Sequence, residues 1–189
     1  MSDFIIQLAT AGDVPAIAWL VNRAAETGTA NFATEPEPVA DWVRDWQETA
    51  ASHPWLVARS NGRVLGFAKA SPHRARGAYR WTAEVTVYID ESRHGEGLGT
   101  ALYGALIPLL RAQGFVTLLA GITAGHVASE RLHARAGFAR CGTFHRSGWK
   151  WGAWYDVGYW ELQLQGAEEP SALRGVDEVW DAGQARRHG

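Results

Sequence analysis

The segment Arg93-His94-Gly95-Glu96-Gly97-Leu98-Gly99-Thr100 decides the fold, because it is a glycine-rich loop that opens directly into a helix. Apolar residues spaced three and four apart predict that helix from Leu98 to Leu109, and Gly114 ends it. Such glycines let the backbone approach an anion, and the unpaired N–H groups of the first helical turn point at it. A tight strand-to-helix turn would need the same glycines, so the loop alone leaves a phosphate site and a plain turn both open. The spacing does exclude a P-loop, because no lysine follows the last glycine.

Residues 81–89 come before this loop and predict a strand, because they are rich in β-branched residues and their polar and apolar positions alternate. The alternation places Glu84 on one face with two threonines and Tyr88, while alanine, valine and isoleucine occupy the other face. A carboxylate in the middle of a strand otherwise suited to burial is a candidate general base. An outward-facing carboxylate on a half-solvated strand has the same pattern.

The chain before this strand predicts one strand, two helices and a hairpin. The strand covers residues 4–8, and the first helix runs from its cap Thr10 to about Glu26. A second helix begins at the Pro36/Pro38 pair. The hairpin has strands at 55–59 and 64–68, which flank an Asn-Gly turn.

The chain after the loop helix predicts a buried strand at 116–122 and a short helix at 128–136, which Gly137 ends. Two closing strands around 138–144 and 155–164 are joined by a loop rich in tryptophan. Residues 1–164 form the predicted domain. Residues 165–189 show no sustained periodicity, and we expect a polar, mobile tail.

Composition excludes several classes of protein. The 189 residues carry 18 Lys and Arg against 20 Asp and Glu, so there is no broad basic field for nucleic acid. No apolar run is long enough for a bilayer and no signal-peptide layout is visible, so we expect a cytoplasmic protein without a membrane partner. Cys141 is the only cysteine, which excludes an internal disulfide, and no Cys or His spacing indicates a metal site.

The order of these elements, together with the block Ser129 to Phe138 (Ser-x-x-Leu-His-x-x-x-Gly-Phe), resembles the GCN5-related N-acetyltransferase (GNAT) family. The resemblance covers about residues 3 to 164. It implies the acyl-CoA N-acyltransferase fold, an α/β fold of the α+β type in which helices flank a mixed, mostly antiparallel sheet. Within the family, several loops look like those of the phosphinothricin and methionine sulfoximine N-acetyltransferases; they are residues 29–36, 54–58, 75–84, 112–115 and 154–158.

The resemblance implies that the glycine loop holds the pyrophosphate of acetyl-CoA, the co-substrate. His94 stands where the family's loop prefers Gln or Arg, and His126 stands where many relatives have Asn. Neither change removes the backbone amides that bind phosphate. The implied cofactor-binding residues are Val87, Tyr88, Ile89, His94, Gly95, Glu96, Gly97, Leu98, Gly99, Thr100, His126 and Ser129.

Two catalytic candidates follow from the resemblance. Glu84 occupies the position of the family's proposed base, which removes a proton from the amine. Related phosphinothricin enzymes have a histidine at the position of His133, where most of the family has a tyrosine near the departing sulfur. His133 is therefore a candidate proton donor, although a lone histidine on a helix is as often a packing residue.

The implied substrate is an amino acid. Together with His73 and Arg80, Arg74 and Arg76 crowd the approach to the Glu84 strand, where a guanidinium can bind a carboxylate or phosphinyl group. A solvated basic turn would have the same composition. The implied substrate contacts are Phe32, Arg74, Arg76, Tyr79, Tyr88 and Val157.

The implied activity is direct transfer of an acetyl group to the α-amine of phosphinothricin-like or methionine sulfoximine-like amino acids, by a homodimer. Two alternatives stay open. The first is an acetyltransferase of the same fold for another amine, such as a protein N-terminus, a polyamine or an antibiotic. The second is a noncatalytic regulator that binds acyl-CoA.

Overall fold

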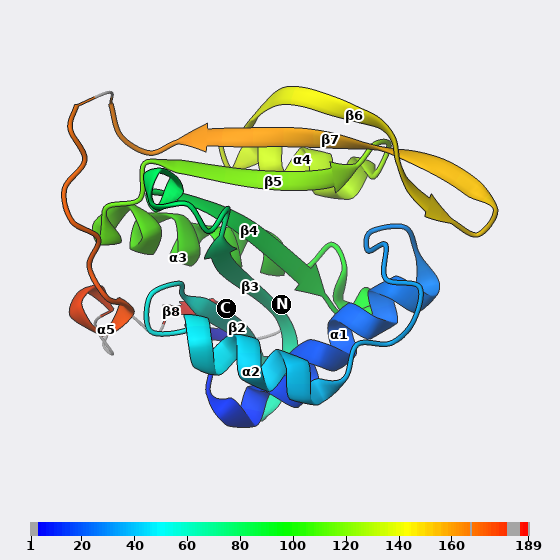
Figure 1. Cartoon of the computed structure of the whole chain (residues 1–189). Helices are drawn as coiled ribbons and strands as arrows, with labels where there is room; N and C mark the ends of the chain where they lie inside the picture. The colour runs from blue at the N-terminus through cyan, green and yellow to red at the C-terminus, as the bar shows by residue number, and fades with distance from the viewer. Residues whose placement is uncertain (1–3, 167, 181–185, 189) are drawn as a thin grey trace.

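The computed structural model describes residues 4–166, 168–180 and 186–188, and its strands form one sheet (Figure 1). The order across the sheet is β6-β7-β5-β4-β3-β2-β1-β8. The strands are β1 (Phe4–Leu8), β2 (Trp55–Ser60), β3 (Arg63–Pro72), β4 (Thr82–Ile89), β5 (Thr117–Thr123), β6 (Ala139–Lys150), β7 (Ala153–Gln163) and β8 (Arg186–His188). Only β4 and β5 pair in parallel among these strands, because the helix between them carries the chain back across the sheet. The expected mixed, mostly antiparallel sheet is confirmed.

Helices cover both faces of this sheet. They are α1 (Val14–Thr27), α2 (Val39–Thr49), α3 (Leu98–Gln113), α4 (Val127–Arg135) and the short α5 (Val176–Val179). Successive residues of β2 serve opposite faces: Leu56 packs in the core with α3, and Val57 packs in the core with α1. The α3 core also contains Leu102, Leu106 and Leu118.

The first helix begins as the sequence predicts, at a cap formed by Thr10 and Asp13. A 3-10 turn, Ala11–Asp13, comes before α1, and the Asp13 carboxylate accepts hydrogen bonds from the Thr10 N–H and hydroxyl at 2.9 Å. Asp13 is buried and also pairs with Arg59 of β2. This ion pair ties the start of α1 to the sheet.

The feature that positions the site is the separation of β4 from β5. The two strands pair only from Thr82 to Glu84, opposite Thr117 to Leu119. Beyond this point β4 continues to Ile89 and pairs with β3 alone. The carboxyl ends of the two parallel strands therefore part immediately after Glu84.

The tryptophan-rich stretch differs from the prediction, because it is not a loop. Strand β6 continues to Lys150, β7 begins at Ala153, and the turn lies at Trp151 and Gly152, both with positive φ. The pairing shifts between Phe144 and Gly148, and Arg146 inside that interval also has a positive φ. This bulge shifts the register inside the β6–β7 hairpin.

Part of the expected tail contacts the domain. Val176 is buried and donates its N–H to the Ala51 carbonyl at 2.8 Å. The buried Gln113 side chain donates to the carbonyls of Ser52 and Arg174 at 2.8 and 2.9 Å. The mobile tail and the boundary at residue 164 stay predictions, and residues 167, 181–185 and 189 of that tail lie outside the described part.

Candidate active site

Glu84 lies where β4 and β5 separate, on the face that alternation predicts. Its neighbours Ala83 and Val85 are buried in the α3 core, whereas the Glu84 side chain is 46% exposed. Its Cα partner on β5 is Leu119, in the last pair of that ladder. The carboxylate is therefore fixed at its backbone and open to a ligand at its oxygens.

A histidine contacts this carboxylate directly. The Nδ1 atom of His73 lies 2.7 Å from Oε1 of Glu84. The His73 ring also meets the Tyr79 ring edge to face, with centroids 5.5 Å apart. From the sequence, His73 is only one member of a basic cluster. The pattern of residues within one strand does not predict that it contacts Glu84.

The basic turn predicted to hold the substrate lies beside this pair. A 3-10 turn, Gly77–Tyr79, follows β3, and the Arg74 guanidinium lies 5.4 Å from the centroid of the Tyr79 ring. Arg76 is exposed and caps the 3-10 turn with its carbonyl, which accepts from the Tyr79 N–H. The structure thus brings Arg74 and Tyr79 into one cluster with His73 and Glu84.

The predicted pocket wall gathers around the segment after α1. The carbonyl of Ala30 accepts a hydrogen bond from the Tyr88 hydroxyl at 3.4 Å, and burial raises the pKa of that hydroxyl. The ring of Phe32 lies so close to Gly148 that a Cβ there would be 2.7 Å from it. Val157 pairs in register with Thr123 of β5.

Lys150 organises this wall, and the sequence analysis missed it. Its buried ammonium donates to the carbonyls of Ala25, Gly28 and Asn31 at 2.5, 3.1 and 2.8 Å. These carbonyls belong to the last turn of α1 and to the segment before Phe32, where a cation is favoured. A lone lysine in a strand gives no sequence signal for such a role, because its acceptors are backbone atoms distant in the chain.

The glycine loop has the geometry expected of an anion site. Gly95 and Gly97 both have a φ of +83°, and Gly97 is the N-cap of α3, so the cap residue itself has no side chain to bind the first N–H groups. Arg93 forms a two-point ion pair with Glu96 at 2.7 and 2.6 Å, which neutralises the loop's carboxylate. A Cβ on Gly99 would lie 2.9 Å from Leu132, so this glycine lets α3 and α4 approach closely.

The predicted histidines of this region have structural partners. His94 is exposed and donates from Nε2 to the Ile89 carbonyl at 3.2 Å. His126 caps α4, because its Nδ1 accepts the Ser129 N–H at 3.2 Å. Its Nε2 is therefore the nitrogen that carries the proton.

His133 lies inside the fold rather than beside Glu84. It is 3% exposed, and its Nδ1 donates to the Ser129 carbonyl at 2.8 Å. Its Nε2 accepts the buried Tyr103 hydroxyl at 2.8 Å, and its ring meets Phe138 edge to face. Desolvation lowers the pKa of His133, so the neutral ring is the favoured form. The packing alternative accounts for this geometry, and the proton-donor role stays a prediction.

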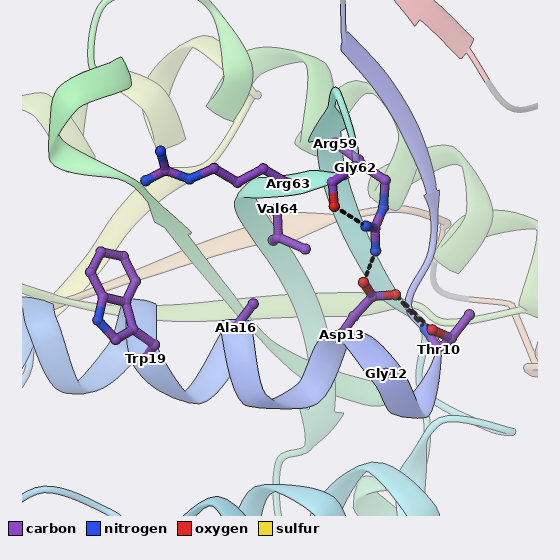
Figure 2. Close-up of a pocket in the computed structure, with 9 residues that line it drawn as sticks. All are labelled: Thr10, Gly12, Asp13, Ala16, Trp19, Arg59, Gly62, Arg63 and Val64. Carbon is purple, nitrogen blue, oxygen red and sulfur yellow. Dashed lines mark hydrogen bonds and ion pairs between the residues drawn. The ribbon is translucent and has the colours of Figure 1, made fainter.

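A separate open cavity of about 590 Å³ lies at the start of α1 and contains none of the predicted site residues (Figure 2). Arg59 spans part of its wall between the Asp13 carboxylate and the Gly62 carbonyl. Two of the guanidinium nitrogens of Arg59 are therefore engaged by the fold, whereas its buried Nε has no hydrogen-bond partner among the described residues. In the part of the chain that the structure describes, no cluster of three His, Cys, Asp or Glu is arranged to hold a metal, and no helix is both long and apolar enough to cross a membrane.

Known proteins share both the sequence and the fold. The acetyltransferase (GNAT) family profile matches residues 16–138. A phosphinothricin N-acetyltransferase of Streptomyces viridochromogenes is 40% identical over 174 residues, 92% of this chain and 95% of that relative. An L-methionine sulfoximine/L-methionine sulfone acetyltransferase of Pseudomonas aeruginosa is 36% identical over 162 residues, 84% of this chain and 94% of that relative.

Solved structures extend the likeness to three dimensions. A phosphinothricin acetyltransferase from Sinorhizobium meliloti, in complex with acetyl-CoA, superimposes with a TM-score of 0.84 at 30% identity. The superposition covers 90% of this chain and 94% of the other. The chain therefore belongs to the acetyltransferase (GNAT) family and is an N-acetyltransferase.

Proposed function

We propose that this enzyme transfers the acetyl group of acetyl-CoA directly to the α-amine of an amino acid of the phosphinothricin or methionine sulfoximine type. The observation that carries the proposal is the position of Glu84. It lies at the separation of β4 and β5 and beside a turn that bears Arg74 and Arg76. The relatives from Streptomyces viridochromogenes and Pseudomonas aeruginosa carry the names of these two substrates.

The glycine loop fits the diphosphate of acetyl-CoA. The positive φ of Gly95 and Gly97 and the uncovered start of α3 supply backbone N–H donors. Glu96 would repel a diphosphate, but its ion pair with Arg93 offsets that charge. Acetyl-CoA supplies the acetyl group as an activated thioester.

Glu84 is the proposed general base. An α-ammonium group cannot attack a carbonyl carbon until it loses a proton, and a carboxylate at the opening between the strands is placed to accept that proton. Replacing the Glu84 carboxylate by an amide of the same shape removes its ability to accept the proton and so tests this role. The variant Glu84→Gln is expected to lower kcat on the order of 100-fold or more, measured at saturating amine and acetyl-CoA. Near-normal turnover of this variant at saturating amine would remove Glu84 from the mechanism.

The basic turn is the proposed clamp for the acidic end of the substrate. A planar guanidinium binds a carboxylate or phosphinyl group through two parallel hydrogen bonds, which would direct the α-amine toward Glu84. Phe32, Tyr88 and Val157 are the proposed apolar wall. The same positive charge disfavours polyamines and aminoglycosides as substrates.

One assay separates this proposal from its alternatives. CoA release is followed with a thiol reagent in the presence of phosphinothricin, methionine sulfoximine, spermidine, kanamycin or a short peptide. Release with the first two alone is the expected result. Release with a different amine would indicate another substrate class, and acetyl-CoA binding without release by any amine would indicate a noncatalytic regulator.

We also propose that the enzyme is a homodimer. Four aromatic side chains of the β6–β7 hairpin are more than half exposed; they are Phe144, Trp149, Trp151 and Trp154. Such large exposed rings close together favour a protein contact over solvent.

A further inference from the structure

The carboxylate of Glu84 does not stand alone, and its partner follows from the pairing of β3 with β4. Ser71 lies directly opposite Glu84 in that antiparallel ladder. His73 is two residues further along the chain and one residue beyond the end of β3, and its ring reaches the Glu84 carboxylate. The small side chain of Ser71 leaves the space opposite Glu84 open to the imidazole.

The contact has one chemically consistent form. The Nδ1 of His73 and Oε1 of Glu84 are 2.7 Å apart, and an ionised carboxylate only accepts hydrogen bonds. Nδ1 therefore carries the proton and donates it to Oε1. The other carboxylate oxygen, Oε2, is left to accept a proton from an amine.

Burial decides which partner meets the substrate. The His73 side chain is 16% exposed and that of Glu84 is 46% exposed, so the histidine is the deeper member. An Asp–His pair in which histidine is the base has the reverse order, with the carboxylate behind the ring. The order found here leaves Glu84 as the reacting group and places His73 behind it.

The His73 ring is itself held by the proposed substrate turn. The rings of Tyr79 and His73 meet at an angle of 81° between their planes. The Arg74 guanidinium lies over the Tyr79 ring. The Tyr79 backbone is fixed by its hydrogen bond to the Arg76 carbonyl at 2.9 Å. The proposed clamp and the proposed base therefore share one support.

We propose that His73 is a positioning residue, which fixes the Glu84 carboxylate by donating from Nδ1 to Oε1 and so aims Oε2 at the substrate amine. The inference rests on the proposed role of Glu84 as base. A carboxylate free to rotate would spend only part of its time in the productive orientation, which is the loss that misplaced catalytic groups show.

Four variants test the proposal by steady-state kinetics over a range of pH. His73→Phe keeps the ring against Tyr79 but has no donor, and it is expected to lower kcat about 10- to 100-fold with KM for acetyl-CoA unchanged. His73→Asn places an amide N–H where Nδ1 stood and is expected to recover the rate to within about 3-fold. The double variant His73→Phe/Glu84→Gln is expected to have a kcat no lower than that of Glu84→Gln alone.

Each contrary result has a distinct meaning. Wild-type kcat in a folded His73→Phe, with Glu84→Gln impaired, overturns the positioning role and leaves the proposed base intact. Failure of His73→Asn to recover the rate, together with a changed pH profile, also overturns it, because the ring would then be exchanging protons. If Glu84→Gln keeps its turnover, the base assignment is wrong.

If Glu84→Gln keeps its turnover, a measurement without substrate still tests the hydrogen bond between His73 and Glu84. Nitrogen-15 spectra of the His73 ring at pH 8 are expected to show the proton on Nδ1 in the wild type. In Glu84→Ala the proton is expected to return to Nε2, its usual position in the neutral side chain of free histidine. A ring protonated on Nε2 in the wild type would contradict the hydrogen bond itself.

Discussion

At the scale of single residues, His133 is buried, and its role as a proton donor is still a prediction. Both of its ring nitrogens have partners inside the fold, the Ser129 carbonyl and the Tyr103 hydroxyl. The Tyr103 hydroxyl is buried, and desolvation raises its pKa, so it stays protonated and continues to donate. A proton entering at Nε2 would disrupt the hydrogen bond from Tyr103, and a proton leaving Nδ1 would disrupt the hydrogen bond to Ser129.

This burial predicts a pH dependence of stability. Desolvation lowers the pKa of His133 below its ordinary value of 6.5, so the unfolded chain binds a proton more readily than the folded protein. The stabilisation is fully present above 6.5 and is lost as the pH falls toward the lowered folded pKa. Thermal denaturation from pH 8 to pH 5 is expected to show a smaller loss of Tm in His133→Phe than in the wild type.

The same variant separates stability from catalysis. His133→Phe leaves the Tyr103 hydroxyl without its acceptor, and a loss of about 1–3 kcal/mol in the free energy of unfolding is expected. Its pH–rate profile is expected to match that of the wild type below the new Tm. A profile that loses one limb would restore His133 as a proton donor.

Sequence reasoning reached Glu84 but not its partner, for a physical reason. The alternation within residues 81–89 is enough to place Glu84 on the less buried face, and the structure has it there. The contact with His73 depends on the register between β3 and β4, which neither strand encodes by itself. Lys150 has the same character, because its acceptors are carbonyls more than 100 residues away in the chain.

At the scale of elements, the segment after α1 is held by three strands. Lys150 of β6 donates to Gly28 and Asn31, Thr123 of β5 donates to the Thr29 carbonyl at 2.6 Å, and Tyr88 of β4 donates to Ala30. Consecutive carbonyls thus accept from different strands. The proposed pocket wall at Phe32 depends on these donors for its position.

Removing the central donor is expected to loosen the wall. Lys150→Met keeps most of the side-chain volume but leaves three carbonyls, one buried and two part-buried, without their cation, and we expect a loss of about 2–4 kcal/mol in urea denaturation. KM for the amine is expected to rise while KM for acetyl-CoA stays constant. Thr123→Val removes one neutral donor and is the matched control, with an expected loss of about 1 kcal/mol. Equal losses of stability and equal changes of KM in the two variants would show that Lys150 holds the wall no more strongly than a neutral donor does.

The elements with a regular period are those that the sequence predicts well. The hairpin of β2 and β3 forms as predicted, but β3 continues to Pro72, four residues beyond the predicted end. The helix α3 with its stop at Gly114 and the helix α4 follow from local patterns and have the expected positions. The β6–β7 hairpin does not, because the Asp156 carboxylate accepts from the Arg146 N–H at 2.7 Å and holds a bulge that shifts the register. Side-chain chemistry across two strands, and not periodicity, sets that geometry.

At the scale of the whole molecule, β4 and β5 are paired at the start of β4 and separated beyond Glu84. The β6–β7 hairpin extends past the end of β5 toward the α1 side of the sheet (Figure 1). Lys150 of this hairpin binds the Ala25 carbonyl in the last turn of α1, so it ties the hairpin to that helix. Lys150 of the hairpin thus also contacts the segment that carries the proposed pocket wall, and the aromatic residues of the hairpin remain exposed.

Those aromatic residues carry the prediction about assembly. Trp149 and Trp154 pair across the hairpin with ring centroids 5.1 Å apart and are 54% and 56% exposed. Sedimentation is expected to give the mass of a dimer for the wild type and of a monomer for Trp154→Glu, because a buried carboxylate at an apolar contact is costly. Trp19→Glu is the control, since Trp19 is 52% exposed but lies on α1, and it is expected to remain a dimer. A wild-type protein that sediments as a monomer would show that the aromatic hairpin meets solvent, or some other partner, rather than a second copy.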